Sequence, residues 1–348
     1  MNNLTFSVLT GGYMSINDSE ECDRLVVKVV GVGGVGVLAL ESMIKAKIRG
    51  VDFIAVDTEA QALETSSAPI KIRLGVNTTK DGGSGSRPES DRADAEESRQ
   101  EIGEALKGAD VVIIVARMGG CTGTGAVQVI ADAAKVSGAL MTVGIVTLPF
   151  NHEGKIRMET AEEGVRALGK RVDSLIVIPN EGMAAVGSTE QNLLEVLTGD
   201  AILTEAVRGI TDLLRPRFPA IDPGDIIRVL PSEYPITFGI GEASGHDRAL
   251  KAAQKAMHPL SRGGVDIAQA SDVLVNIAGS SDMTMADYNE VNKFICSKIS
   301  DDTQIKICFT VDDRLEDKIK VTVYLSKSEP TATIRTENTN YDVPSYLL

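Results

Sequence analysis

Two glycine-rich turns are the candidate sites for chemistry in this chain, because both have the composition that binds phosphate groups. The first, "GVGGVG" at 31–36, follows the β-branched run "LVVKVV" and precedes an apolar helical pattern. The second, "MGGCTGTGA" at 118–126, follows "ADVVIIVAR" and opens another helical pattern. Glycine lets the backbone approach an anion closely, and free N–H groups at a helix start bind phosphate. The sequence therefore predicts two phosphate turns.

The first turn taken alone favours a dinucleotide. Gly31, Gly33 and Gly36 spell G-x-G-x-x-G, and Asp57 supplies an acidic residue at the end of the next apolar run, as in NAD-binding folds. A dinucleotide fold needs only one phosphate turn, however. A second turn after a neighbouring strand favours a di- or triphosphate clasped between the two. No G-x-x-x-x-G-K-[ST] sequence occurs, so the loop is not of the Walker A type, and tight turns without a ligand are the remaining alternative.

Composition excludes several classes of function. The formal net charge of −14 disfavours nucleic acid or anionic lipid as a partner. The four cysteines and three histidines are scattered, which indicates reduced thiols in the cytoplasm and neither a disulfide framework nor a metal site. The sequence contains neither a signal-peptide pattern nor an apolar run long enough to span a membrane. We therefore expect a cytoplasmic protein that does not insert into the membrane.

The order of the elements predicts an α/β fold. Five β-branched runs alternate with helical patterns between about 25 and 178, which is typical of a parallel sheet with right-handed crossovers. The segment 75–94 is rich in glycine, serine and charge and is predicted to be a long mobile loop. One long helix is expected over 189–215. Four strand-like runs and two helical stretches follow it and predict a second, smaller α+β domain.

The second turn resembles the tubulin/FtsZ signature GGGTGTG, with Cys121 in place of the third glycine. Further matching segments follow the family order over about 25–326: "DTEAQAL", "AEES", "PFNHEGKIRMETAEEGV", "DSLIVIPNE", "AVRGITDLL" and "VLVNIAG". The resemblance lies on the bacterial and archaeal FtsZ side. It implies a Rossmann-like GTPase domain with a parallel sheet, a long central helix and a smaller α+β C-terminal domain.

The resemblance also implies boundaries along the chain. The expected units are a flexible N-terminal arm at 1–23, a GTP-binding domain at 24–188, the central helix at 189–215, a GTPase-activating domain at 216–326, a short linker at 327–341 and a partner-binding peptide at 342–348.

The same resemblance implies a role for particular residues in binding GTP or GDP. Glu153 and Arg157 match positions that contact ribose and phosphate, although their spacing also predicts a helical ion pair. Asn180 and Asp200 match positions that contact guanine. Mg²⁺ would bridge phosphate oxygens largely through waters, without a protein metal cluster. The phosphates would be cradled by Gly33, Gly34, Gly36, Gly119, Gly120, Cys121, Thr122, Gly123, Thr124 and Gly125.

Asp222 and Asp225, in "AIDPGDII", are the predicted catalytic pair. The resemblance implies that they enter the nucleotide site of the next subunit and orient the attacking water, so that hydrolysis requires head-to-tail polymerisation. The same residues also fit a helix N-terminus, with an N-cap aspartate, a proline at the first position and an acidic residue in the first turn. One aspartate can serve both purposes.

The sequence departs from the family pattern near the nucleotide. Ala220 stands where an asparagine is usual, Val37 and Leu38 replace a Gly-Asn pair, and the 75–94 segment carries extra residues. These changes predict a slow GTPase. Cys121 begins a predicted helix, where a small replacement for glycine and a redox-sensitive thiol are both open.

The C-terminal sequence "DVPSYLL", Asp342–Leu348, resembles the FtsZ peptide that docks onto membrane-tethering division proteins. The predicted function is a GTP-hydrolysing cytoskeletal protein that forms filaments with itself and builds the cell-division ring at midcell, at the inner face of the membrane. The alternatives are a paralogue whose filaments scaffold something other than the septum, and a dinucleotide-binding oxidoreductase.

Overall fold

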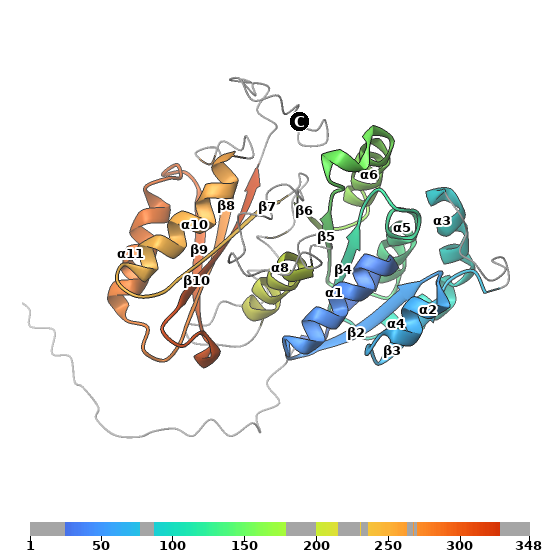
Figure 1. Cartoon of the computed structure of the whole chain (residues 1–348), viewed down its shortest axis with the longest axis horizontal. Coiled ribbons are helices and arrows are strands. Elements are labelled where there is room, and N and C mark those ends of the chain that lie inside the picture. The colour runs from blue at the N-terminus through green and yellow to red at the C-terminus, as the bar shows by residue number, and fades with distance from the viewer. Residues whose placement is uncertain are drawn as a thin grey trace, which may run out of the picture.

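Two β-sheets organise the chain in the computed structural model, as Figure 1 shows. The structure describes residues 25–76, 87–178, 200–214, 230, 236–262, 267 and 270–327. The larger sheet has six parallel strands in the order β3-β2-β1-β4-β5-β6. Its strands are β1 Val27–Val32, β2 Val51–Asp57, β3 Ile70–Arg73, β4 Val111–Arg117, β5 Met141–Thr147 and β6 Ser174–Ile178.

Helices cover both faces of the larger sheet, so its strands are buried on both sides and contain near-continuous runs of apolar residues. Successive residues of β1 point to opposite cores: Val29 packs with α1 and α8, and Val30 packs with α4, α5 and α6. The elements around this sheet are α1 Gly33–Lys45, α2 Ala60–Thr65, α3 Pro88–Glu97, α4 Arg99–Leu106, α5 Cys121–Val136, η1 Asn151–Glu153, α6 Lys155–Gly169 and α8 Asp200–Leu213.

The order in which the parallel strands are added to the larger sheet changes sides between β1 and β4. From β1 it passes outward to β2 and β3, and then returns to β4 on the other side of β1. The two strands pair in parallel, with Val32 opposite Ala116 at their carboxyl ends. Crevices at such a reversal are where open α/β sheets bind ligands. Both predicted phosphate turns follow directly from these strand ends.

The segment 75–94, predicted to be one long loop, is corrected in part by the structure. Residues 88–94 belong to α3, and 77–86 lie outside the described residues. Pro88 occupies the first helical position, where its missing N–H costs nothing, and Glu89 and Asp91 lie in the first turn, where acidic side chains complement the helix dipole. The four-residue strand β3 was also missed, since "IKIR" is too short and polar to give a clear pattern.

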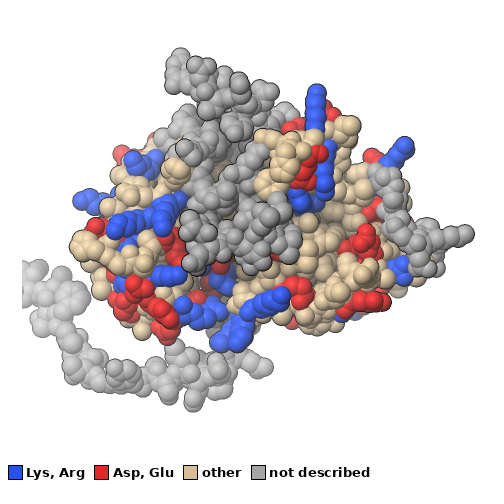
Figure 2. Space-filling view, viewed as in Figure 1, with Lys and Arg blue, Asp and Glu red and all other residues tan. Residues whose placement is uncertain are grey.

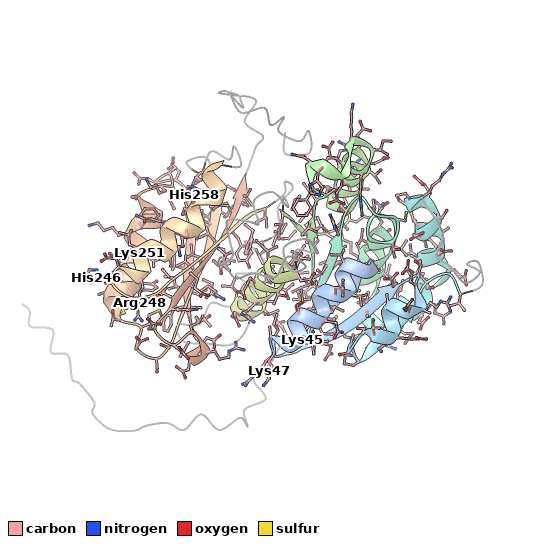
Figure 3. The ribbon with its side chains drawn as sticks, in the orientation of Figure 1. Lys45, Lys47, His246, Arg248, Lys251 and His258 are labelled. Carbon is pink, nitrogen blue, oxygen red and sulfur yellow. The ribbon has the colours of Figure 1, made fainter. Side chains whose placement is uncertain are left out.

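The smaller sheet has four strands in the order β7-β10-β8-β9. Its elements are β7 Thr237–Ala243, α10 Arg248–Arg262, β8 Ala270–Gly279, α11 Met285–Cys296, β9 Gln304–Val311, η4 Asp313–Leu315 and β10 Ile319–Lys327. These confirm the four strand-like runs and two helical stretches of the sequence. One face packs under α10 and α11. Arg248 lies at the start of α10 (Figure 3). It pairs with Asp282 at 2.8 Å and with Asp287 of α11 at 3.3 Å.

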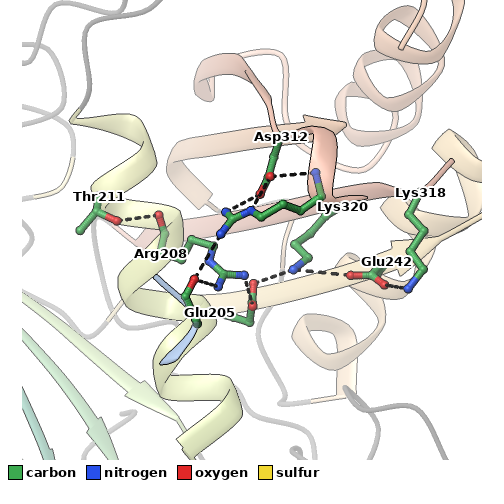
Figure 4. Close-up of polar contacts among 9 residues, drawn as sticks. Glu205, Arg208, Thr211, Glu242, Asp312, Lys318 and Lys320 are labelled. Carbon is green, nitrogen blue, oxygen red and sulfur yellow. Dashed lines mark hydrogen bonds and ion pairs between the residues drawn. The ribbon is translucent and has the colours of Figure 1, made fainter. Parts of the chain in front are cut away.

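Helix α8, the described part of the predicted central helix, joins the two sheets. The predicted residues 189–199 lie outside the described part of the chain. Tyr324 of β10 donates a hydrogen bond to the Ala206 carbonyl at 3.0 Å, within the core. Figure 4 shows Lys320 between Glu205 of α8, at 2.8 Å, and Glu242 of β7, at 3.5 Å. A buried hydrogen bond and an ion-pair network therefore link α8 to the second sheet.

The surface carries charges of both signs. On the face drawn in Figure 2, Lys and Arg side chains alternate with Asp and Glu side chains. Lys45 and Lys47 lie at the carboxyl end of α1 (Figure 3), where positive charge complements the helix dipole. Among the described helices, none combines the length and the apolar character that crossing a bilayer requires.

The close packing of α10 on Gly241 of β7 predicts that a larger residue there lowers the stability of the protein. A Cβ on Gly241 would overlap the backbone of Ala252 and Ala256, whereas a Cβ on Gly103 in α4 would meet no atom within 4 Å. We expect Gly241→Ala to destabilise the protein by about 1–3 kcal/mol through overpacking. Gly103→Ala, the matched control, should stabilise it by roughly 0.5–1 kcal/mol. Urea unfolding measures both, and a Gly241→Ala variant as stable as the parent would contradict the packing described.

Candidate functional site

The two glycine turns lie against each other at the carboxyl ends of β1 and β4. Gly33 has a φ of +73°, and a Cβ there would lie 3.2 Å from the Gly123 amide nitrogen and 3.4 Å from the Thr122 Cβ. Only glycine satisfies both the left-handed backbone and this close approach. The structure thus brings together the two predicted phosphate turns, which lie almost 90 residues apart in the sequence.

Part of each turn faces open space. A Cβ on Gly34 or on Gly120 would meet no atom within 4 Å. Helix α5 begins at Cys121, immediately after Gly120, so its first N–H groups have no partner within the helix. Positive partial charge at that helix end attracts anions. The open glycines and the start of α5 therefore form a cradle whose backbone an anionic ligand can reach.

Other predicted phosphate residues pack closely against neighbouring backbone. A Cβ on Gly36 would lie 2.6 Å from the Val115 carbonyl oxygen, and one on Gly123 or Gly125 would overlap the backbone of Arg117 or Pro88. The Thr124 hydroxyl is buried and accepts a hydrogen bond from the Gly119 amide at 2.9 Å. These residues hold α3, α5 and β4 close enough together to shape the cradle.

Thr122 is the hydroxyl-bearing residue at the open edge of the second turn. Its hydroxyl donates to Asp91 Oδ2 at 2.6 Å and lies 3.2 Å from the hydroxyl of Thr58, which follows β2. Three elements, α3, α5 and the end of β2, therefore meet at one threonine. Thr58 and Asp91 were not among the predicted site residues.

Two buried carboxylates lie on the β2 side of the cradle. Burial raises the pKa of Asp57 to about 6, although the Glu59 amide donates a hydrogen bond to it at 3.1 Å, and the charge of Asp91 adds to the rise. Burial also raises the pKa of Asp91, against the hydrogen bond from Thr122. Negative charge is thus poorly compensated on this side of the candidate site.

Two arginines and Glu153 form the opposite side. Glu153 accepts a hydrogen bond from the Phe150 amide at 2.8 Å, pairs with Arg157 at 2.8 Å and bonds to Arg117, whose guanidinium lies 5.9 Å from the centre of the Phe150 ring. The ion pair that the four-residue spacing of Glu153 and Arg157 predicts is present. Their contacts with ribose and phosphate stay predictions. Gly119 packs against this group, with a Cβ position 2.7 Å from the Arg157 carbonyl oxygen.

The predicted base-binding and catalytic residues are described only in part. Asp200 is buried at the start of α8, which packs against α1. Val37 lies in the core and Leu38 is exposed on α1. Asn180, Ala220, Asp222 and Asp225 lie outside the described residues, as does the 342–348 peptide. The roles predicted for these residues stay predictions.

The residues that sequence reasoning missed had weak signals. Thr58 and Arg117 stand at the carboxyl ends of β2 and β4, and side chains at that edge of a parallel sheet are candidates for ligand binding. Strand position could therefore have pointed to both. Asp91 had no such signal, because its segment was interpreted as a loop.

Comparisons with known protein families match most of the chain. The model described as "Tubulin/FtsZ family, GTPase domain" matches residues 26–188, and "FtsZ family, C-terminal domain" matches 236–327. A curated relative, "Cell division protein FtsZ" of Pseudomonas putida, is 40% identical over 300 residues, which cover 86% of this chain and 75% of the relative. These matches do not favour a dinucleotide-binding oxidoreductase.

Solved structures share the whole fold. "FtsZ dimer, empty (M. jannaschii)" superposes with a TM-score of 0.81 at 32% identity and covers 90% of this chain and 91% of that one. A more distant match, "CetZ2 from Haloferax volcanii - GTPgS bound protofilament", has a TM-score of 0.68 at 20% identity and covers 88% and 95% of the two chains. At that identity the likeness concerns the fold alone.

The raised pKa of Asp57 predicts a pH dependence of stability. Because its folded pKa of about 6 exceeds the ordinary 3.8, the protonated carboxyl stabilises the folded state below about pH 4, and this contribution disappears as the pH rises through about 6. Asp57→Asn keeps the acceptor for the Glu59 amide but does not titrate. The variant should gain on the order of 2–3 kcal/mol relative to the parent between these pH values.

Unfolding in urea, without nucleotide, at several pH values measures this gain. Glu64→Gln, which neutralises an exposed carboxylate of α2, is the control and should shift the profile little. A difference between Asp57→Asn and the parent that stays constant from pH 4 to about 7 would show that Asp57 does not titrate as described.

Proposed function

The chain belongs to the tubulin/FtsZ family of GTPases, and from this premise we propose that it polymerises head-to-tail into filaments that form the cell-division ring. The family matches cover both halves of the chain, and a 40% identical relative is itself a cell division protein. Filaments would localise as a ring at midcell. The alternative of a non-divisional scaffold has no particular observation in its favour.

The cradle between the two turns is the observation that carries nucleotide binding. The turns meet at Gly33 and Gly123, and open backbone at Gly34 and Gly120 lies beside the start of α5. Backbone N–H groups bind phosphates without a lysine. The chain needs no basic patch for this purpose, which agrees with its net charge of −14. GTP and GDP are therefore the proposed ligands.

Guanine and magnesium complete the proposed complex. A carboxylate such as Asp200 accepts from guanine N1–H and N2–H together, and adenine lacks that pair of donors. Among the described residues, no cluster of three metal-ligating side chains exists. Mg²⁺ suits such a site because it usually binds phosphate and water oxygens together with one or two carboxylates. Buried carboxylate oxygens beside Thr122 fit that donor set. When bound, the ion would neutralise phosphate charge.

Hydrolysis is proposed to require two subunits. Asp222 and Asp225 would enter the nucleotide site of the next subunit and orient the attacking water. Each subunit then supplies the phosphate cradle at one end and the carboxylates at the other. Ala220, Val37 and Leu38 would make turnover slow, but the phosphate turns and both aspartates are retained.

Phosphate release from GTP with Mg²⁺, measured against protein concentration, tests this proposal. We expect specific activity to appear only above a threshold concentration, because an isolated subunit lacks a complete site. Asp222→Asn should bind GTP normally and lose at least about 100-fold in turnover, the scale of removing a group that positions the nucleophile. Asp317→Asn, an exposed change in the same domain, is the control.

Mixing makes the test specific for a shared site. Asp222→Asn subunits added to the parent protein should lower its activity, because each variant subunit in a filament leaves one neighbouring nucleotide site without its catalytic carboxylate. Specific activity that is independent of concentration would contradict a site completed between subunits.

The peptide Asp342–Leu348 is proposed to dock onto a membrane-tethering division protein. Its pattern of proline followed by aromatic and aliphatic residues suits capture by an apolar groove. The preceding linker spans only roughly 20 Å as a flexible chain, so a tethered filament would lie close to the membrane.

Tyr346→Ala should abolish membrane recruitment of a fluorescent fusion in the native cell, because it removes the largest apolar contact of the peptide. Ser345→Ala is the matched control, and GTP turnover should be unchanged in both variants. A Tyr346→Ala fusion that still forms midcell rings would rule out this tethering role.

A further inference from the structure

Asp91 is a buried carboxylate at the cradle. Its side chain is 1% exposed, on the first turn of α3, and Oδ2 accepts the hydrogen bond from Thr122. The second oxygen, Oδ1, is buried and has no hydrogen-bond partner among the described residues. Burial of a carboxylate oxygen without a partner costs free energy, and a bound ligand at that oxygen would recover this cost.

The described cations near the cradle do not provide that partner. Arg117 and Arg157 pair with Glu153 on the opposite side. Arg92 lies on α3 itself but is exposed. Asp57 and Asp94 add negative charge around Asp91. A small cation bound at Oδ1 would compensate this charge.

The packing of α3 on α5 fixes where Asp91 stands. Gly125 lies so close to Pro88 that a Cβ would overlap its carbonyl oxygen, and this contact sets the start of α3 against the first turn of α5. Asp91 is thereby held at Thr122, on the turn that faces the cradle. The Thr122 hydroxyl donates its one hydrogen to Asp91, so toward Thr58 it accepts, and one of its two oxygen lone pairs remains for a further partner.

A carboxylate and a threonine hydroxyl on a phosphate turn are ligand types that a hard divalent cation prefers. The P-loop enzymes hold Mg²⁺ with the same pair of group types. On this basis we propose that Asp91 is a direct ligand, through Oδ1, of the divalent cation that accompanies the bound nucleotide. The inference rests on the proposed binding of GTP, and it assigns a metal-ligating residue beyond the phosphate and water ligands expected from the sequence.

The test measures the affinity of a non-hydrolysable GTP analogue by calorimetry in EDTA, in Mg²⁺ and in Cd²⁺. Asp91→Asn retains an acceptor for Thr122 but is a poor metal ligand. Asp91→Cys supplies a soft thiolate, which favours Cd²⁺ over Mg²⁺. Glu89→Gln neutralises an exposed carboxylate on the same helix and is the matched control. Thermal unfolding of each variant confirms that it is folded.

In the parent protein and in Glu89→Gln, Mg²⁺ should strengthen binding strongly over EDTA. In Asp91→Asn this enhancement should fall by at least about tenfold, the loss typical of a weakened metal site. Affinity in EDTA should not fall, because a negative charge near the phosphates has gone. Asp91→Cys should be weak in Mg²⁺ and regain the enhancement in Cd²⁺, whereas Asp91→Asn should not regain it. Cys121 is present in every variant and so cancels in the comparison.

Two results would overturn the assignment. An unchanged Mg²⁺ enhancement in Asp91→Asn would show that Asp91 only positions Thr122 and does not bind the metal ion. Equal responses of Asp91→Asn and Asp91→Cys to Cd²⁺ would show that Asp91 acts only through its charge. If the parent protein does not bind the analogue under any condition, the proposed function fails instead, so the two failures are distinguishable.

Discussion

The contact between Gly33 and Gly123 is the constraint on which the site depends. It exists because the strand order reverses between β1 and β4, which places two strand ends that are distant in sequence side by side. A side chain at Gly33 would be strained by the φ of +73°, and its Cβ would crowd the Gly123 amide and the Thr122 side chain. This close approach places the open backbone at Gly34 and Gly120 at one edge of the sheet. Backbone donors are rigid, so they bind phosphate without the entropy cost of ordering side chains.

The cradle is electrically asymmetric, and this asymmetry follows from which strand carries which residue. The β2 side contributes buried carboxylates, and the opposite side contributes two arginines that share Glu153. A triphosphate placed between them meets positive charge on one side and needs a cation on the other. Because Asp57 and Asp91 are buried, solvent screens this field poorly. A metal ion on the β2 side would compensate the negative charge of both the phosphates and the buried carboxylates.

The sequence alone was sufficient to predict the elements that have a short-range pattern. The glycine turns, the long β-branched strands and the helices that follow them all have short-range signals, and each was predicted. The errors share one cause. The strand "IKIR" is four residues long and half polar, and helix α3 begins among serines and charges, so hydrophobic periodicity identified neither. Asp91 was missed with them. Its significance comes from contacts with Thr122 of α5, 31 residues away, and no spacing rule connects the two.

The two sheets, one in each predicted domain, share a core. Residues of the first sheet such as Ile113 belong to the same buried cluster as Tyr324 and Leu274 of the second, with α8 between them. Separating the sheets would expose that cluster and would break the buried hydrogen bond from Tyr324 to α8. Gly209 allows this arrangement, since a Cβ there would overlap the Tyr324 hydroxyl. Asp200 begins the same helix, so α8 physically connects the predicted guanine contact to the second sheet. The two sheets are thus packed together through the buried cluster around α8.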